Sequence, residues 1–462
     1  MVKRIFTGFK ERLLIWIDRS PHAVLLALIL ALVAFDGYYV WHSRHHASGF
    51  TGMSWDIAES LRKGEGYSFI APSYFPFSGA TNKTSAAREP VPVLLFVAVG
   101  ALFNGSYLAL GAFHILVRIL TLLGIFTLAR QIAGVRVAVL AAIGWLVYLP
   151  ALREVPAKEV DLIAALFTVW GLALAVRAWS ADRMVWWFAS GIMLGLATLT
   201  RSALLAVALA ITVCLFLFRK DSQGSRRLRP ILLFVGAIAA VQLPWVVRNV
   251  AAFGQPVIGT TLAGYNLYRQ NHMLEEGKLV PFVAGPATQQ SLQALIARHP
   301  ELTGIENEAE FDRFLREESF RIIAAHPGGY VLLCLYRFPA LWLNWGVPEA
   351  YGNSPNTTDY LMMIQQALLL VLAFTTGTLE LWEKSWPIIA GVVAFTLIHM
   401  AVAARMLYTI DVVPSLLPLA SVSILSVSAR HRWASVMLPT SGVAWVLYAV
   451  LVDLGRLPPP SS

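Results

Sequence analysis

Residues 23–41 read AVLLALILALVAFDGYYVW, an apolar run whose only charged residue is Asp36. A helix needs about 20 mostly apolar residues to cross the roughly 30 Å hydrocarbon core of a bilayer, so this run has the length of a membrane span. Comparable runs follow, among them 202–218 and 230–245. The sequence therefore predicts an all-α polytopic membrane protein.

The composition points the same way, with 57% hydrophobic residues, 14% charged residues and a mean hydropathy of +0.63. The net charge of +9 comes from lysines and arginines dispersed at the ends of the predicted helices, as the positive-inside rule requires. Nucleic acid is therefore not expected as a partner. Cys214 and Cys334 lie in different predicted segments and form neither a disulfide framework nor a metal-binding pattern.

The distribution of basic residues predicts the sidedness of the chain. Segment 1–22 is basic and amphipathic, which predicts a cytoplasmic surface helix leading into the first span. The polar segment His42–Glu89 then lies outside. Val91–Phe103 is too short to span comfortably, so we expect it at the outer surface, and the next inward span at about Leu108–Leu128. Every later basic short loop then falls in the cytoplasm.

This assignment gives about 11 spans, or up to 13 if Tyr330–Trp345 is one of an extra pair of crossings rather than an interfacial helix. The long outer segment contains a helix of soluble character, Glu308–Ala325. The predicted organisation has four parts: the N-terminus 1–22, a transmembrane catalytic half 23–250 with the first outer loop 42–107, an outer loop with interfacial helices 251–357, and C-terminal transmembrane helices 358–462.

Two carboxylates lie in the first outer loop. Asp56 and Glu59 belong to Ser54–Leu61, which reads as a short amphipathic helix ended by Gly64. A carboxylate beside the membrane is suited to general-base chemistry. Spacing alone favours the simpler interpretation, a solvated loop helix.

Further charged residues lie at predicted helix starts. Arg88 and Glu89 precede the short apolar segment, where Arg88 either binds a phosphate or extends its charge to the interface. Another span, which runs to about Trp179, begins with Lys158, Glu159 and Asp161. An acid there either stabilises the helix dipole or adds a second acid to an outer cavity.

Three arginines lie outside under the predicted topology, against the positive-inside bias: Arg201, Arg248 and Arg405. Each arginine by itself could be explained as an anchor of its helix at the membrane interface. Together they indicate an anion site, because the planar guanidinium suits phosphate. Asp36 and Arg118 are isolated charges within predicted spans. Asp36 either bonds a neighbour in the bundle or stays protonated.

These elements, in this order, resemble the C-type glycosyltransferases of bacterial membranes, in particular the protein O-mannosyltransferase-like and lipid A aminoarabinose-transferase-like families. The likeness covers about Trp55 to Asn271 and the region of Arg405. The matching motifs are Asp56-Ile-Ala-Glu-Ser-Leu61 with Gly64-x-Gly-Tyr67, Arg88-x-Pro-x-Pro92, Tyr148-Leu-Pro150 before Lys158-Glu159, Gly195-Leu-Ala-x-Leu-Thr-Arg201, Pro244-Trp-x-x-Arg-Asn249 and Gly264-Tyr-Asn-Leu267.

The resemblance implies transfer of a sugar from a polyprenyl-phosphate carrier to a lipid, glycan or protein acceptor at the periplasmic face of the bacterial inner membrane. It also implies a catalytic base in the first outer loop. Phe50 stands near the usual position of that acid, so we assign Asp56, with Glu59 and Glu89 as the other catalytic candidates. No cofactor is required, and a divalent metal is left open. The expected substrate contacts are Arg88, Lys158, Glu159, Arg201, Arg248, Asn249 and Arg405.

Two other functions compete with this hypothesis. A secondary transporter would need broken helices near the midplane, often in paired repeats. The chain shows no paired halves and has a large outer loop instead, which favours the enzyme. A non-catalytic lipid-binding relative is the second alternative, since the acid is absent from its usual place.

Overall fold

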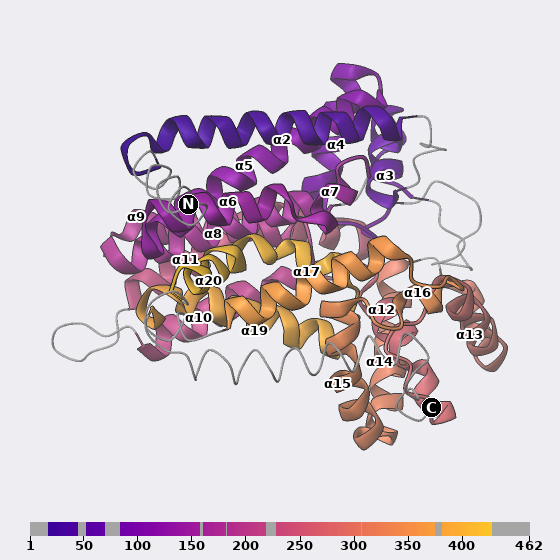
Figure 1. The fold of residues 1–462 in the computed structure, drawn as a ribbon. Helices are drawn as coiled ribbons and strands as arrows, with labels where there is room; N and C mark the ends of the chain where they lie inside the picture. The colour runs from indigo at the N-terminus through magenta and orange to yellow at the C-terminus, as the bar shows by residue number, and fades with distance from the viewer. Residues whose placement is uncertain are drawn as a thin grey trace.

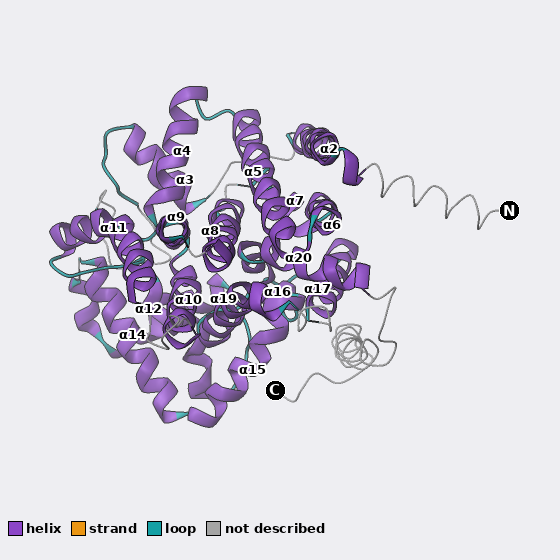
Figure 2. Ribbon diagram, turned by 90° about the vertical axis from the view of Figure 1, so that its left-hand side faces the viewer, coloured by secondary structure: helices purple, strands orange, loops and turns teal. Residues whose placement is uncertain are grey.

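The computed structural model describes residues 17–44, 52–69, 84–157, 160–181, 183–218, 228–305, 307–374 and 381–426. In these ranges the regular structure is helical, apart from one isolated bridge between Ser68 and Thr84. Most of the long helices run side by side in one bundle (Figure 1), and Figure 2 looks along them. The predicted all-α fold is confirmed.

Five helices are long and apolar enough, by length and composition, to cross a membrane. They are α2 (Pro21–Ser43), α5 (Tyr107–Ala133), α8 (Asp161–Ala181), α11 (Leu228–Phe253) and, through Lys384–Ala401, α19 (Trp382–Ala401). Shorter apolar helices accompany them: α4 (Pro90–Phe103), α6 (Val135–Leu146), α9 (Met184–Thr198), η1 with α10 (Ser202–Phe218), α17 (Thr357–Ala373) and α20 (Val413–Ser426). The chain is thus a polytopic membrane protein. The span expected near its C-terminus lies outside the described residues.

Small residues bring the central helices close together. α8 packs between α5 and α9, and α9 packs on α11. A Cβ added to Gly191 of α9 would lie 2.4 Å from the Phe234 carbonyl oxygen of α11, and one on Gly171 of α8 would lie 2.7 Å from Leu194 of α9. Lipid tails are as apolar as the helix surfaces, so the hydrophobic effect does not drive helices together in a membrane. Association there depends on close van der Waals packing, which small residues permit.

Asp36 and Arg118 answer the question left by the sequence. They form an ion pair between α2 and α5, and both side chains are fully buried. Arg118 also donates a 2.9 Å hydrogen bond to the Trp145 carbonyl of α6. The pair therefore joins three helices and leaves neither charge facing lipid.

The remaining helices gather at one end of the bundle, at the right of Figure 1. They are α3 (Met53–Arg62), α7 (Leu149–Glu154), α12 (Ala263–Asn271), α13 (Gly285–Arg298), α14 (Glu308–Ala325), α15 (Pro327–Leu343) and α16 (Val347–Ala350). We call this the α12–α16 end. The predicted helix 308–325 is confirmed, and the positive φ of Gly64 follows α3 as its glycine signal predicted.

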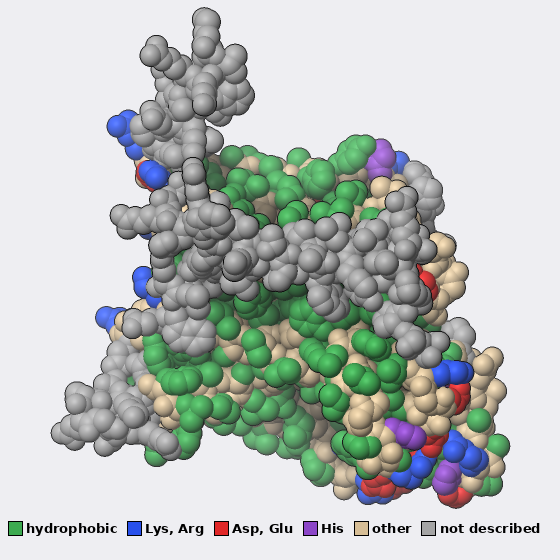
Figure 3. Space-filling model, turned by 60° about the horizontal axis from the view of Figure 1, so that its bottom comes forward, with side chains coloured by type: hydrophobic (Ala, Val, Ile, Leu, Met, Phe, Trp, Pro, Cys, Tyr) green, Lys and Arg blue, Asp and Glu red, His purple; other side chains and the backbone are tan. Residues whose placement is uncertain are grey.

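Charged side chains separate towards the two ends of the bundle. Figure 3 shows an apolar band, with Lys and Arg on its left edge and mixed charges at the lower right. Exposed arginines lie at or beside the α5–α6 and α8–α9 connections, mostly in the adjoining helix ends: Arg130, Arg136, Arg177 and Arg183. The α12–α16 end, in contrast, carries acids and bases together, as in the ion pairs of Arg321 with Glu275 and Glu318.

Candidate active site

Arg201 lies in the turn between α9 and η1, at the α12–α16 end. Its guanidinium pairs with Asp161, the first residue of α8, and its Nε lies 2.9 Å from Oδ2 of Asp411 in η4 (Met406–Asp411). The Tyr408 ring centroid is 4.6 Å from the guanidinium carbon. Three segments far apart in the sequence thus meet around one guanidinium, a cluster that we call the Arg201 group.

The Arg201 group holds two carboxylates against one cation. The Asp161 side chain is 5% exposed and that of Asp411 is fully buried. Burial raises the pKa of Asp411 well above its ordinary value, and the Arg201 charge acts against this rise. Arg201 therefore brings no uncompensated positive charge to the site.

Asp411 was not selected by the sequence analysis. The available signal was an acid six residues after Arg405, directly before the apolar run that begins at Val412. That signal is weak, because only the fold shows that this acid meets Arg201.

Glu89 is joined to the Arg201 turn. Its Oε1 accepts a 2.7 Å hydrogen bond from the Ser202 backbone N–H, and its carboxylate charge acts on both Arg201 and Asp411. The N–H of Val91 bonds the Leu199 carbonyl at 3.1 Å, so the start of α4 is fastened to this turn. The structure thus brings together two of the predicted site residues, Glu89 and Arg201.

Glu308, the first residue of α14, holds the chain that leads into Glu89. Its Oε2 accepts hydrogen bonds from the Ala86 N–H at 3.0 Å, from the Ser85 hydroxyl at 3.1 Å and from the Thr261 hydroxyl at 2.8 Å. Burial raises the pKa of Glu308, and these donors oppose the rise. The carboxylate of α14 therefore positions the segment before α4.

Arg248 also holds this segment. Its Nη1 donates to the Ser85 carbonyl and to Oδ1 of Asn249, both at 2.8 Å, and its guanidinium carbon lies 5.0 Å from the Tyr67 ring centroid. Asn249 is fully buried and donates to the Val257 carbonyl at 2.9 Å. Both predicted residues therefore make structural contacts within the protein.

Among the predicted arginines, Arg88 and Arg405 have the fewest protein oxygens bonded to their guanidinium groups in the part of the chain that the structure describes. Neither side chain makes an ion pair with any residue in the described ranges, and both are half-buried. Arg405 instead lines a cavity of about 160 Å³ at the junction of α7, α16, α17 and η4. Arg153 of α7 lines the same cavity, 3.8 Å from Oδ1 of Asp359. The sequence analysis did not select Arg153.

The first-loop acids lie on α3, which packs on α4. The rings of Trp55 and Phe96 are 5.9 Å apart between these helices. Asp56 is exposed, and Glu59 pairs with Arg62 at 2.6 Å. The helix that carries Asp56 thus packs on α4, while Glu89, which precedes α4, contacts the Arg201 turn directly. Lys158 and Glu159 lie outside the described residues.

The described residues contain no group of three or more His, Cys, Asp or Glu side chains that could hold a metal ion. Asp161 and Asp411 meet at one point of the site, but both carboxylates form ion pairs with Arg201.

Comparison with known proteins agrees with this fold. Residues 87–247 match the family model of dolichyl-phosphate-mannose-protein mannosyltransferase. This segment includes Glu89, Asp161 and Arg201. No curated protein sequence matches the chain.

Solved structures with the same fold include the oligosaccharyltransferase of Archaeoglobus fulgidus. Its complex with zinc and sulfate aligns with 15% identity and a TM-score of 0.50, covering 94% of this chain and 52% of that one. The apo form aligns with 14% identity and a TM-score of 0.50, covering 96% and 55%. ArnT from Cupriavidus metallidurans, bound to undecaprenyl phosphate, aligns with 14% identity and a TM-score of 0.37, covering 86% of this chain and 77% of that one.

The chain therefore has the fold of the C-type membrane glycosyltransferases, and the resemblance seen in the sequence is confirmed. It spans about half the length of the archaeal structures that it matches.

Proposed function

We propose that this protein is a membrane glycosyltransferase that moves a sugar from a polyprenyl-phosphate carrier to an acceptor hydroxyl. One observation carries the proposal: the segment that matches the mannosyltransferase family supplies Glu89, Asp161 and Arg201, which come together at the α12–α16 end. The donor is a lipid-linked sugar, and the acceptor is a lipid, a glycan or a protein.

The α12–α16 end is the periplasmic end in this proposal. Its support is the cluster of exposed arginines at the α5–α6 and α8–α9 turns, which the positive-inside rule places in the cytoplasm. The N-terminus is then cytoplasmic, and membrane lipids surround the apolar band of Figure 3 in the bacterial inner membrane. Segment 23–250 is the catalytic half, and 251–357 is the periplasmic part.

The proposed reaction is a direct displacement that inverts the anomeric carbon. The acceptor oxygen forms the new bond to that carbon as the bond to the phosphate oxygen breaks, and the acceptor proton passes to a carboxylate. Asp56 is the proposed base, with Glu59 and Glu89 as the other candidates. A positioned base contributes about 10²–10⁴-fold to such a reaction.

The arginines differ in how directly they could meet the leaving phosphate. Arg405 and Arg88 make no ion pair with any carboxylate in the described ranges, whereas Arg153, which lines the same cavity as Arg405, lies 3.8 Å from Oδ1 of Asp359. Arg201 and Arg248 are held by protein oxygens and position the surrounding turns. We therefore assign the phosphate first to Arg405 and Arg88. Lys158, Glu159 and Asn249 remain predicted substrate-binding residues, and no step passes through a metal.

Incubation of the purified protein with several polyprenyl-phosphate sugars tests the function, with release of free carrier phosphate as the readout. We expect Asp56→Asn to lower the rate by about 10²–10⁴-fold without loss of folded protein. Glu65→Gln is the matched control, since Glu65 is an exposed acid in the same loop.

The same assay separates the alternatives. Full activity of Asp56→Asn with loss in Glu89→Gln moves the base to Glu89. Absence of release with every donor overturns the enzyme. In that case, counterflow of a labelled solute in liposomes would identify a transporter, and carrier binding without turnover would identify a lipid-binding relative.

A further inference from the structure

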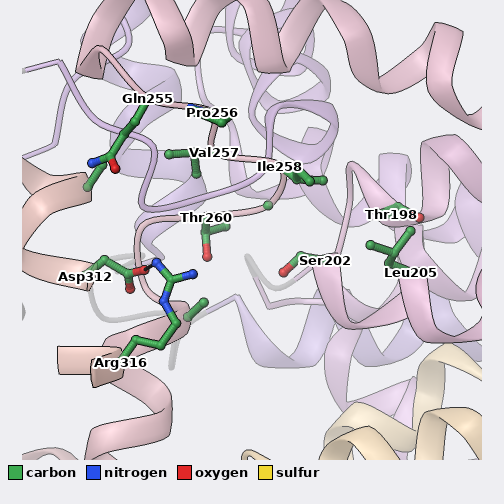
Figure 4. Close-up of a pocket in the computed structure, with 13 residues that line it drawn as sticks. Thr198, Ser202, Leu205, Gln255, Pro256, Val257, Ile258, Thr260, Asp312 and Arg316 are labelled. Atoms are coloured by element: carbon green, nitrogen blue, oxygen red, sulfur yellow. Dashed lines mark hydrogen bonds and ion pairs between the residues drawn. The ribbon is translucent and has the colours of Figure 1, made fainter. Parts of the chain in front are cut away.

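A second cavity lies on the other side of the Arg201 turn. Its volume is about 270 Å³, it is partly open, and it is lined by the start of η1, the loop 255–260 and α14. Figure 4 shows Ser202 on one side, Thr260 above, and Asp312 with Arg316 on the opposite side. None of these four residues belongs to the proposed catalytic or phosphate-binding set.

The cavity presents hydroxyl groups that are available to a ligand. The side chains of Ser202 and Thr260 point into the space between them in Figure 4. The Ser202 hydroxyl makes no hydrogen bond within the described ranges, and the Thr260 oxygen accepts only a long one, 3.4 Å from the Leu262 N–H. Each hydroxyl can therefore both donate to and accept from a bound molecule.

The charges of the cavity compensate each other. Arg316 Nη2 lies 3.2 Å from Oδ2 of Asp312, whose Oδ1 accepts a 2.6 Å hydrogen bond from the Gly264 N–H. The Asp312 side chain is 5% exposed, whereas that of Arg316 is 48% exposed. An anionic ligand would have to share a guanidinium that already has a carboxylate partner, so the lining favours a neutral polar molecule.

The size of the cavity limits the ligand further. A volume of 270 Å³ equals the liquid volume of about nine water molecules and falls just below the usual range of small-molecule pockets. That space accommodates one sugar ring with its hydroxyls. Ring hydroxyls need closely spaced donors and acceptors, which the hydroxyls, the carboxylate and the guanidinium supply.

The cavity is also next to the turn that Glu89, an alternative candidate for the base, contacts. The Ser202 N–H is held by Glu89, while the Ser202 side chain lines the cavity. Arg201, the preceding residue, points into its ion pairs with Asp161 and Asp411. One turn therefore has the Arg201 group on one side and the cavity on the other.

We propose that this cavity binds one neutral sugar ring of a substrate through Ser202, Thr260, Asp312 and Arg316. The inference rests on the proposed function for its place in the reaction, since the ring belongs either to the acceptor or to the donor. Direct binding of a sugar can nevertheless be measured without turnover.

The test titrates the purified protein with methyl glycosides of glucose, galactose, mannose and N-acetylglucosamine, followed by saturation-transfer NMR and calorimetry. The detergent must carry no sugar headgroup, so that it does not compete. We expect at least one glycoside to bind, and Thr260→Val and Arg316→Gln each to weaken that binding about tenfold or more. Arg313→Gln, an exposed arginine on the same helix that does not line the cavity, should leave binding unchanged.

Absence of glycoside binding, equal binding by the variants, or displacement of the glycoside by inorganic phosphate would each overturn the inference. If carrier phosphate is still released in that case, the transferase stands without this site. If variant-sensitive binding occurs but no donor is turned over, only the transferase fails.

The source of the sugar ring follows from the transfer assay. A higher KM for the acceptor in Thr260→Val assigns the ring to the acceptor, and a higher KM for the donor assigns it to the donor. Unchanged KM values for both would contradict the site.

Discussion

Two buried ionic groups in this molecule are built differently. Asp36 and Arg118 form a pair of equal and opposite charges, both fully buried between long helices. The Arg201 group places two carboxylates on one guanidinium, at helix ends and in the short helix η4. The first pair has no net charge, whereas two ionised carboxylates on one guanidinium leave a net negative charge that can respond to protons, to neighbouring arginines or to a substrate.

The location of each group agrees with this difference. The Asp36–Arg118 pair joins α2 to α5, and a charge exposed to lipid there would be costly. The Arg201 group lies where the chain leaves regular helices and where Glu89 and Arg405 converge. Charge in the first region therefore supports assembly, while charge in the second is placed for chemistry.

Removal of one partner of the intramembrane pair should have the largest effect on stability. Asp36→Ala leaves Arg118 buried without its counterion, which costs about 3–5 kcal/mol. We expect a large fall in the yield of folded protein and in its thermal unfolding midpoint. The double variant Asp36→Leu with Arg118→Met should recover most of the loss, because no charge remains buried. A single variant as stable as the natural protein would show that the pair is not structural.

The arginines of the second region should separate activity from stability. Arg405→Gln should lower transfer by about 10²–10³-fold, or about 3–4 kcal/mol, and leave the unfolding midpoint nearly unchanged, because no described ion pair is lost. Arg201→Gln should lower both, since Asp161 and Asp411 would then face each other without a cation. The measurements are donor turnover and thermal unfolding. If both variants lost the same stability and the donor KM were unchanged in Arg405→Gln, Arg405 would not differ from Arg201 in role.

A smaller effect should appear as a dependence of stability on pH. Burial raises the pKa of Asp312 from 3.8 to about 6, so the folded state binds this proton more tightly than the unfolded state. The stabilisation is complete below about pH 4 and is lost as the pH rises to about 6, up to about 3 kcal/mol in total. Thermal unfolding at several pH values should show this fall. It should disappear in Asp312→Asn and persist in Glu317→Gln, an exposed acid on the same helix.

The sequence predicted local elements well where local signals were strong. The helix Glu308–Ala325 was predicted with the bounds that the structure shows, and the short apolar segment after Glu89 is the separate helix α4. Both follow from patterns within one segment: mixed charge at helical spacing in the first, and proline at the start of a short apolar run in the second.

The candidate site was only partly predictable. Glu89 and Arg201 were selected separately from charges at helix ends, and the fold joins them. Asp411 was missed because its partner is distant in the sequence. The sequence analysis also grouped Arg201 with Arg248 and Arg405, whereas their contacts differ: ion pairs for the first, carbonyl oxygens for the second, and a cavity for the third.

By itself the sequence determined that this chain is a helical membrane protein with charges at the ends of its predicted helices, because hydrophobic length and the placement of arginine are local properties of each segment. Only the tertiary structure decided which charges compensate one another. Two carboxylates share Arg201, Asp36 is matched by Arg118, and Arg405 faces a cavity. Ion pairs act over a few ångströms, and those distances arise only when helices far apart in the chain pack together.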